Sequence, residues 1–338
     1  MNILFDINHP VDVNFFKNAI LNLQNKGNNI HIIFRERGKL EKILRYELDQ
    51  FPITLIGKHK HGFVKKISSQ LQRDYRIITY IKKNKIDLVA CFGATSAISS
   101  WYCRKPYLAF DDDFEYKIPF YHANWFSTRH IYPDFIKFSN SRTFKYHGFK
   151  ELAYLHPKYL KTSDKILKKY SILPDEYVFV REIANISLNY QEDNSILNEL
   201  INKIKKKDLK IILSLEDKNL TDNFIEDCII LEEPVSDINS LLYYSLFAVS
   251  SGDTVARETA LLGVPTIYTG GRAMVVNGAL IEAGLMFEST NVNDITEFID
   301  TITVDKKKKN RENSLNLIEN RWENTTSVIL NHIDDFLI

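Results

Sequence analysis

Residues 250–271 read SSGDTVARETALLGVPTIYTGG, and the apolar run SLFAVS ends where this stretch begins. The order of apolar, polar and helically spaced residues predicts a strand, a turn, a helix and a second strand. Asp253 or Thr254 could simply cap the helix. In an open α/β sheet, the first turn of a helix beyond the carboxyl end of a strand also binds phosphate groups. Capping needs neither Gly252 nor the acid one turn later, Glu258, so these residues favour a binding site.

Strand-like and helix-like segments alternate along the rest of the chain in the same way. The strand-like segments are NILFDI, NIHIIF, DLVACF and PYLAF in the first half, and YVFVRE, LKIILSL, CIILEE and LFAVSS in the second. A polar and aromatic region, 140–175, separates the halves. We therefore predict an α/β protein of two Rossmann-like, doubly wound parallel-sheet domains, 1–160 and 161–338, with the last helix packing back on the first. The cleft between two such domains is a preferred position for a ligand.

The composition restricts the class of protein. The 338 residues are 44% apolar and 26% charged, as in soluble globular proteins, and the net charge of +1 gives no overall attraction to nucleic acid. The three cysteines, Cys91, Cys103 and Cys228, are widely spaced, which fits a reducing cytoplasm and offers no metal-binding pattern. No secretory signal and no apolar run of membrane-spanning length occur. We expect a cytoplasmic protein.

The opening stretch, extended to SSGDTVARETALLGVPTIYTGGRAMVVNGALIEAGL, resembles the donor-binding segment of MurG-type GT-B glycosyltransferases. Those enzymes have Ser-Gly at a helix start, a Glu on that helix and a Gly-x-Pro turn. The segments DINHPVDVNFFKNAI, FGATSA, FDDDFE and YHGFKELAYLHP are similar to a family catalogued as domain of unknown function 354. The resemblance covers most of the chain and implies a GT-B-like fold, an architecture that sugar-nucleotide 2-epimerases share.

The resemblance implies donor-binding residues in the second domain. Ser251, Gly252, Asp253 and Thr254 would lie at the nucleotide diphosphate, which suits backbone N–H groups. Glu258 would accept the ribose hydroxyls. The expected donor is a nucleotide sugar, most simply a UDP-sugar, acting as substrate with no other cofactor.

Three further residues are donor-binding candidates with structural alternatives. Arg257 either pairs with phosphate or faces solvent, and Asn277 either contacts the donor sugar or occupies a surface turn. Arg181, at the end of YVFV, either compensates the charge of the leaving nucleotide or pairs with Glu182. Because no metal-binding pattern is evident there, Arg181 and the helix N-terminus would act without a metal.

The loop NHPVD, after the first strand, supplies candidates for the catalytic base. MurG-type enzymes carry a His there as the proposed general base, and the matching position here is Asp12, counted back from Gly27. A carboxylate can deprotonate an acceptor hydroxyl. His9 is the alternative base, and helix capping is the structural explanation for Asp12.

An acidic run, DDDFE, follows the strand PYLAF. Its four acids repel one another and need compensation by acceptor hydroxyls, a cation or solvent; they are Asp111, Asp112, Asp113 and Glu115. We predict acceptor binding by these residues, with a solvated acidic loop as the alternative. Two carboxylates without a His are a weak metal signal, so no metal is predicted.

A basic stretch covers residues 58–85. It contains nine Lys or Arg, at positions 58, 60, 65, 66, 73, 76, 82, 83 and 85, against one acid, Asp74. The helical spacing of Val64, Ile67, Leu71, Tyr75 and Ile78 predicts the buried face. The bases then form either a solvated outer helix or a patch for anionic headgroups or a polyanionic acceptor, which would make the protein peripheral at the inner membrane face.

These inferences predict an inverting, metal-independent glycosyltransferase of cell-surface polysaccharide or glycolipid synthesis. It would move a sugar from a nucleotide-diphosphate donor to a hydroxyl of a glycan or lipid-linked acceptor, and no nucleic-acid partner is expected. One alternative is a non-hydrolysing sugar-nucleotide 2-epimerase, which needs acids on both faces of the sugar C2. The other is a non-catalytic subunit that binds a sugar nucleotide.

Overall fold

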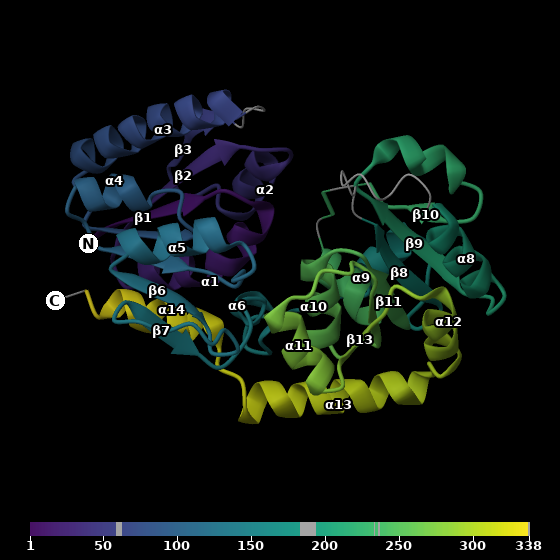
Figure 1. Ribbon diagram of the computed structural model, residues 1–338. Coiled ribbons are helices and arrows are strands. Elements are labelled where there is room, and N and C mark those ends of the chain that lie inside the picture. The colour runs from purple at the N-terminus through teal and green to yellow at the C-terminus, as the bar shows by residue number, and fades with distance from the viewer. Residues whose placement is uncertain (59–62, 183–193, 233, 236, 337–338) are drawn as a thin grey trace. The chain divides into compact units, whose positions relative to one another are not determined.

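The computed structural model describes residues 1–58, 63–182, 194–232, 234–235 and 237–336. The chain divides into two compact units (Figure 1). The first unit comprises Met1–Tyr159 and Trp322–Ile338, and the second comprises Leu160–Arg321. The chain therefore leaves the first unit once and returns to it at its C-terminal end.

The first unit contains a seven-stranded parallel sheet of order β3-β2-β1-β4-β5-β6-β7. Its strands are β1 (Asn2–Ile7), β2 (Asn29–Glu36), β3 (Ile53–Lys58), β4 (Leu88–Phe92), β5 (Tyr107–Phe110), β6 (Arg129–Pro133) and β7 (Thr143–Tyr146). The central strands are apolar runs because helices cover both faces of the sheet. The strand order reverses direction at β1, and in such sheets ligands bind beyond the carboxyl ends of the strands at this point.

Helices cover the two faces of this sheet. They are α1 (Pro10–Asn25), α2 (Leu40–Glu47), α3 (Phe63–Lys83), α4 (Ala97–Tyr102), α5 (Lys117–Phe126), α6 (Leu152–Leu155) and α14 (Thr325–Asp334). One core cluster joins Ile77 of α3, Ala97 of α4 and Ala123 of α5 to β-strand residues. On the other face, α14 packs against α1 and α6. Thr325 and Thr326 fix α14 there by donating hydrogen bonds to the carbonyls of Phe149 and Ala153, both at 2.7 Å.

The predicted buried face of α3 is wrong. Leu71 and Tyr75 are 67% and 71% exposed, whereas Asp74 is buried beside a stripe of three further buried residues, Arg73, Ile77 and Ile81. These three are spaced four residues apart, so they form the stripe that faces the sheet. The sequence pattern misleads because an arginine occupies a core position and apolar residues occupy the outer surface. Val64, Ile67, Lys60, Lys65 and Lys66 lie outside the part of the chain whose side chains the structure describes.

The second unit contains a six-stranded parallel sheet of order β10-β9-β8-β11-β12-β13. Its strands are β8 (Tyr177–Glu182), β9 (Lys210–Leu215), β10 (Ile229–Ile230), β11 (Phe247–Ser250), β12 (Thr266–Tyr268) and β13 (Met286–Glu288). The order reverses between β8 and β11. The point for ligand binding in this sheet is therefore at the ends of those two strands.

The helices of the second unit are α7 (Lys165–Lys169), α8 (Asn194–Lys205), α9 (Ile238–Tyr244), α10 (Asp253–Leu261), α11 (Val275–Glu282), α12 (Val292–Asp300) and α13 (Val304–Asn320), with a 3₁₀ turn at Lys218–Asn223. The main core lies between β8, β9, β11 and helices α8 and α12. Gly263, in the Gly-Val-Pro turn, has φ +70°, and a Cβ there would lie 2.4 Å from Cα of Arg311. Only glycine therefore allows α13 to pack against this turn.

Within the described residues, no helix combines the length and the apolar character needed to cross a bilayer.

Candidate functional site

Both sheets have ionisable and polar residues at the carboxyl ends of their central strands. In the first unit, the loop between β1 and α1 is closed by a capping box. The N-cap of α1 is His9, not Asp12, and its Nδ1 accepts a hydrogen bond from the backbone N–H of Val11. Asp12 lies three positions later, and its Oδ2 accepts from the N–H groups of Asn8 and His9, each at 2.9 Å. Both predicted bases therefore lie at the start of α1, His9 as its N-cap and Asp12 in its first turn.

The burial of Asp12 changes its acid–base behaviour. Burial raises the pKa of this carboxyl from 3.8 to about 7, although the two backbone N–H donors and the charge of Lys150 oppose the rise. Burial lowers the pKa of His9 to about 4, assisted by the charges of Arg37 and Lys150. A base is most effective when its pKa lies near the working pH. At neutral pH, Asp12 is thus better suited than His9 to accept and return a proton.

A buried ion pair lies where this loop begins, at the end of β1. Arg73 of α3 donates to both carboxylate oxygens of Asp6 at the end of β1, and both side chains are fully buried. Thr95 and Ser96 also donate to Asp6. Burial alone would raise the pKa of Asp6. The charge of Arg73, its hydrogen bonds and the hydrogen bonds from the Thr95 and Ser96 hydroxyls outweigh burial, so the pKa of Asp6 lies below its usual value. Asn8 donates to Thr95 at 2.8 Å, so the network reaches the loop between β1 and α1.

The acidic run after β5 is compensated by the protein itself. Oδ1 of Asp111 accepts from the N–H groups of Asp112 and Asp113, and its Oδ2 lies 3.5 Å from Nε2 of His130. Oδ2 of Asp112 lies 2.9 Å from Nζ of Lys150, and this pair is buried. The cation that balances Asp112 is thus the ammonium of Lys150, and Asp111 is balanced by backbone N–H groups, which the sequence pattern did not indicate.

The outer two acids of the run are less buried. Asp113 accepts a hydrogen bond from the backbone N–H of Tyr116 at 3.3 Å, and Glu115 is half-buried. Acceptor binding stays a prediction for all four acids. Within the described residues, no group of three His, Cys, Asp or Glu side chains is arranged to hold a metal ion.

Lys150 connects these segments, and sequence reasoning missed it. It lies in the loop after β7, and its ammonium pairs with Asp112 and stands 5.1 Å above the ring of Phe92 at the end of β4. Its charge lowers the pKa of both His9 and Asp12. The residues around it, GFKEL, give no sign of this role, because its partners are at least 38 positions away in the chain.

In the second unit, α10 begins directly after the central strand β11. Its N-cap is Gly252, and no side chain caps it, so the predicted capping by Asp253 or Thr254 is wrong. The first turn of a helix carries N–H groups without an intrahelical partner, and the helix dipole adds positive potential there. This helix start therefore has the donors for a phosphate group.

Arg181 lies beside this helix start. β8 pairs with β11 so that Arg181 is opposite Ser250, and the N–H of Ser251 donates to the carbonyl of Arg181 at 3.0 Å. The guanidinium of Arg181 donates to Oγ of Ser214 at 2.6 Å. Burial raises the pKa of the neighbouring Glu182 to about 7, against a hydrogen bond from Ser251 and the charge of Arg181. The structure thus brings Arg181 and the Ser-Gly turn together, and contact of either with a donor stays a prediction.

Arg257 and Asn277 form an internal connection between α10 and α11. Both side chains are almost completely buried, so the solvent-facing alternative for Arg257 and the surface-turn alternative for Asn277 are wrong. Nη1 of Arg257 donates to Oδ1 of Asn277, and Nδ2 of Asn277 donates to Oδ1 of Asp253, both at 3.2 Å. Their amide and guanidinium groups therefore position Asp253. Direct contact of either residue with a donor stays a prediction.

The remaining predicted donor residues surround the same turn. Glu258 is buried on α10, one turn after Asp253, and Thr254 is half-buried in the first turn. Burial and a hydrogen bond to Asp253 raise the pKa of the Tyr268 hydroxyl. A Cβ at Gly270 would lie 2.4 Å from the carbonyl oxygen of Ser251 and 2.5 Å from the hydroxyl of Tyr268. The chain after β12 thus approaches the Ser-Gly turn too closely for any side chain at position 270.

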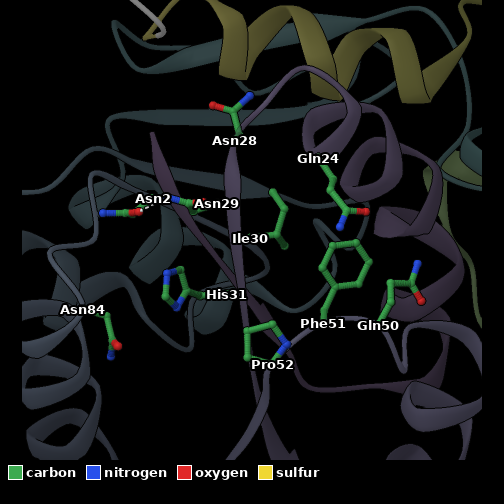
Figure 2. A pocket seen from close by; sticks show the side chains of 10 residues that line it. All are labelled: Asn2, Gln24, Asn28, Asn29, Ile30, His31, Gln50, Phe51, Pro52 and Asn84. Atoms are coloured by element: carbon green, nitrogen blue, oxygen red, sulfur yellow. Dashed lines mark hydrogen bonds between the residues drawn. The ribbon is translucent and has the colours of Figure 1, made fainter.

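A separate hollow of about 510 Å³ lies at the opposite edge of the first sheet, at the amino ends of β1 and β2 (Figure 2). Side-chain amides dominate its lining, and some of them bond within the protein. Asn28 donates to the carbonyl of Leu23, and Asn29 donates to the side chain of Asn2. This hollow lies away from the carboxyl ends of the strands.

Comparisons with known proteins agree with this architecture. The model of a protein family of unknown function, DUF354, matches residues 1–94 and 133–336. An uncharacterised protein of Methanocaldococcus jannaschii is 23% identical over 320 residues, which cover 89% of this chain and 91% of that protein.

Solved structures of similar fold include two kinds of enzyme. A putative UDP-N-acetylglucosamine 2-epimerase from Listeria monocytogenes has a TM-score of 0.76 and 13% identity, covering 100% of this chain and 96% of that one. The UDP-GlcNAc 2-epimerase of M. jannaschii, solved with UDP-GlcNAc and UDP, has a TM-score of 0.75 and 15% identity (99% and 100% covered). MurG of Acinetobacter baumannii has a TM-score of 0.63 and 13% identity (99% and 100% covered). At these identities the likeness shows the fold, and the predicted two-domain GT-B-like architecture is confirmed. The chain belongs to the DUF354 family.

Proposed function

We propose that this protein is a glycosyltransferase that moves a sugar from a nucleotide-diphosphate donor, most simply a UDP-sugar, to a hydroxyl of a glycan or lipid-linked acceptor. The observation that carries the proposal is the start of α10, which has no side-chain cap and lies beside Arg181 at the switch point of the second sheet. Its structural neighbours include UDP-GlcNAc 2-epimerases and MurG, and this likeness supports a UDP-sugar as the ligand.

The donor would bind through its diphosphate and ribose. The N–H groups of the first turn of α10 and the guanidinium of Arg181 would compensate the charge that develops on the leaving nucleotide. Glu258, one turn further along, would accept the two ribose hydroxyls. Asn277 and Arg257 would act by positioning Asp253 rather than by reaching phosphate, because their polar groups already contact each other. In this scheme the charge compensation comes from the protein, with no metal assigned a role.

The acceptor hydroxyl would lose its proton to Asp12. Its Oδ2 is held by two backbone N–H groups, which leaves Oδ1 as the oxygen that accepts the proton. Because its pKa lies near 7, this carboxyl can take the proton as the hydroxyl attacks the anomeric carbon and release it to solvent afterwards. Attack by an activated hydroxyl from the face opposite the nucleotide would invert the configuration. Lys150 would keep Asp12 partly ionised at neutral pH, since its charge opposes the effect of burial.

A 2-epimerase is the second candidate. It is favoured by the higher TM-scores to the epimerases, 0.76 and 0.75, than to MurG, 0.63. In that reaction an ionisable group removes the proton from the sugar C2, and Asp12 has a suitable pKa for this role as well. The third candidate is a non-catalytic subunit that only binds the sugar nucleotide.

Incubating the purified chain with a panel of nucleotide sugars in D₂O distinguishes the three. Slow release of the free nucleotide, accelerated by added lipid or glycan extract, supports the transferase. Deuterium at C2 of a recovered isomeric sugar nucleotide supports the epimerase, and binding without any product supports the subunit.

A pair of matched variants locates the site in the same assay. Glu258→Gln should weaken nucleotide binding, whereas Glu282→Gln, an exposed acid on α11 of the same unit, should not. If calorimetry detects no binding of any nucleotide sugar in the panel, the proposed function is wrong.

A further inference from the structure

Large apolar side chains are concentrated on the outer surface of α3 and α4. Leu71 and Tyr75 on α3 are exposed, and Trp101 and Tyr102 on α4 are 61% and 60% exposed. Single exposed apolar residues are common on proteins, but a contiguous group of them indicates an interaction surface. Together with the half-buried Ile78, these residues are called the aromatic surface below.

The aromatic surface is continuous across the two helices. A hollow of about 590 Å³ is lined by Tyr75, Ile78, Thr79, Lys82, Lys83 and Tyr102. Nζ of Lys82 stands 5.3 Å above the ring of Tyr102, which connects α3 with α4. The ring of Trp101 packs edge-on against Phe126 of α5 at 5.7 Å. Helices α3, α4 and α5 cover the same face of the sheet, so their outer sides form one surface (Figure 1).

Exposed charge around this surface is positive. Between residues 69 and 105 the exposed bases are Arg76, Lys82, Lys83, Lys85 and Arg104. The same range contains two acids, Asp74 and Asp87. Asp74 is buried and accepts from Gln70 and Ser99, and Asp87 accepts from the N–H of Asn2. The surface is thus locally basic, although the whole chain carries a net charge of only +1.

We propose that the aromatic surface docks this unit on an anionic lipid bilayer. Trp and Tyr rings with an apolar body and a polar edge are favoured at the headgroup level of a membrane, and neighbouring lysines are attracted to anionic headgroups. Leucine and isoleucine beside them can enter the acyl boundary, as in helices that lie in the interface plane. This combination fits a bilayer better than a nucleic acid, because contacts to phosphates alone would leave the exposed Leu71, Trp101 and Tyr102 side chains uncovered, whereas a bilayer offers an apolar layer beside its anionic groups.

The docking goes beyond the proposed function and does not require it. If sugar transfer also holds, docking would bring the enzyme to the layer that carries a lipid-linked acceptor. Binding to vesicles is measured without any nucleotide sugar, so failure of one proposal leaves the other intact.

Sedimentation of the full chain with vesicles tests the proposal. The protein should bind vesicles of phosphatidylcholine mixed with phosphatidylglycerol much more strongly than vesicles of phosphatidylcholine alone. Lys82→Glu with Lys83→Glu should reduce the partition coefficient at least tenfold, because each base near an anionic surface contributes substantially to binding. Lys308→Glu with Lys309→Glu is the matched control, since this exposed adjacent pair on α13 undergoes the same change of charge. The control should bind as the wild type does.

A second pair of variants tests the apolar contribution. Trp101→Ser with Tyr102→Ser should weaken binding at least tenfold, although the charge is unchanged, and should remove most of the blue shift of tryptophan emission on vesicles. Circular dichroism and the unfolding midpoint should match the wild type, because both side chains are exposed. The proposal is overturned if the wild type does not bind anionic vesicles, or if the α13 control loses binding equally. It is also overturned if the aromatic variant only abolishes self-association in analytical ultracentrifugation, which would assign the surface to a second copy of the chain.

Discussion

The raised pKa of Asp12 predicts a specific dependence of stability on pH. The folded-state pKa is about 7, against 3.8 for an unperturbed Asp carboxyl, so the folded protein binds a proton at Asp12 over a range in which the unfolded chain does not. A group of this kind stabilises the fold below its unfolded pKa, and the contribution is lost as the pH rises towards the folded pKa. Between pH 5 and pH 8.5 this loss is about 3 kcal/mol.

Asp12→Asn removes this titration while keeping an oxygen that can accept the N–H groups of Asn8 and His9. The wild type should therefore lose about 3 kcal/mol of stability relative to the variant between pH 5 and pH 8.5. Taking the difference between the two proteins cancels the titration of every other group that they share. Chemical denaturation followed by tryptophan fluorescence suits this measurement, because Trp101, Trp125 and Trp322 all belong to the first unit.

A pH-independent difference between wild type and Asp12→Asn would refute the reasoning. It would mean that Asp12 ionises with an ordinary pKa and therefore does not exchange a proton near neutral pH. His9→Ala is the control, because His9 is the N-cap of the same helix but has its pKa lowered, not raised. Above pH 7 that variant should be about 1 kcal/mol less stable than the wild type because the cap is missing. Between pH 5 and pH 7 the difference should change in the opposite direction to that of Asp12→Asn, because a lowered pKa makes the wild type gain stability at this position as the pH rises.

The other predictions concern three different residues. Glu258→Gln should weaken nucleotide-sugar binding by about 1 to 3 kcal/mol with an unchanged unfolding midpoint, and unchanged affinity in calorimetry would remove Glu258 from the site. Lys150→Met should raise the pKa of His9, measured by NMR titration of its imidazole, because the lysine charge lowers that pKa in the wild type. Lys150→Arg keeps the charge and should leave the pKa near its wild-type value. An identical titration in all three proteins would show that the charge at position 150 does not act on His9. Gly270→Ala should destabilise the second unit by about 1 to 3 kcal/mol through the clash with Ser251, while Gly278→Ala, which has open space around it, should be neutral or stabilising; equal effects on the denaturation midpoint would argue against the close approach.

Much of the fold follows from local patterns in the sequence. The strands β1, β2, β4, β5, β8, β9 and β11 are short apolar runs with clear boundaries, so alternation with helices could be recognised. The strands β3, β6 and β7 were missed, because ITLIGK, RHIYP and TFKY mix charged and polar residues with apolar ones; β3 and β7 are the two edge strands of the sheet, and β6 lies beside β7. Edge positions need less continuous apolar character, so they leave a weaker signal.

The candidate site was predictable only where it depends on neighbours in the chain. A polar turn after an apolar strand is visible in the sequence, and it located Gly252 and Asp12 on their helix starts. Lys150 and Arg73 could not be recognised in this way. Each is paired with an acid on a distant strand or loop, Lys150 with Asp112 and Arg73 with Asp6. A basic residue in a helical pattern is ordinarily assigned to the surface, and only tertiary contacts reveal that Arg73 is buried.

The return of α14 to the first unit has a consequence for the order in which the protein is made. α14 packs on α1 and α6, but the ribosome must first synthesise all of Leu160–Arg321. At ordinary rates of translation this delay lasts roughly 10 to 30 s. During that time the surface of α1 that α14 will cover has no partner from its own unit. Chaperones can bind this uncovered surface, or the chain can aggregate through it. A premature stop after Arg321 would leave the second unit complete and would damage the part of the chain that was synthesised first.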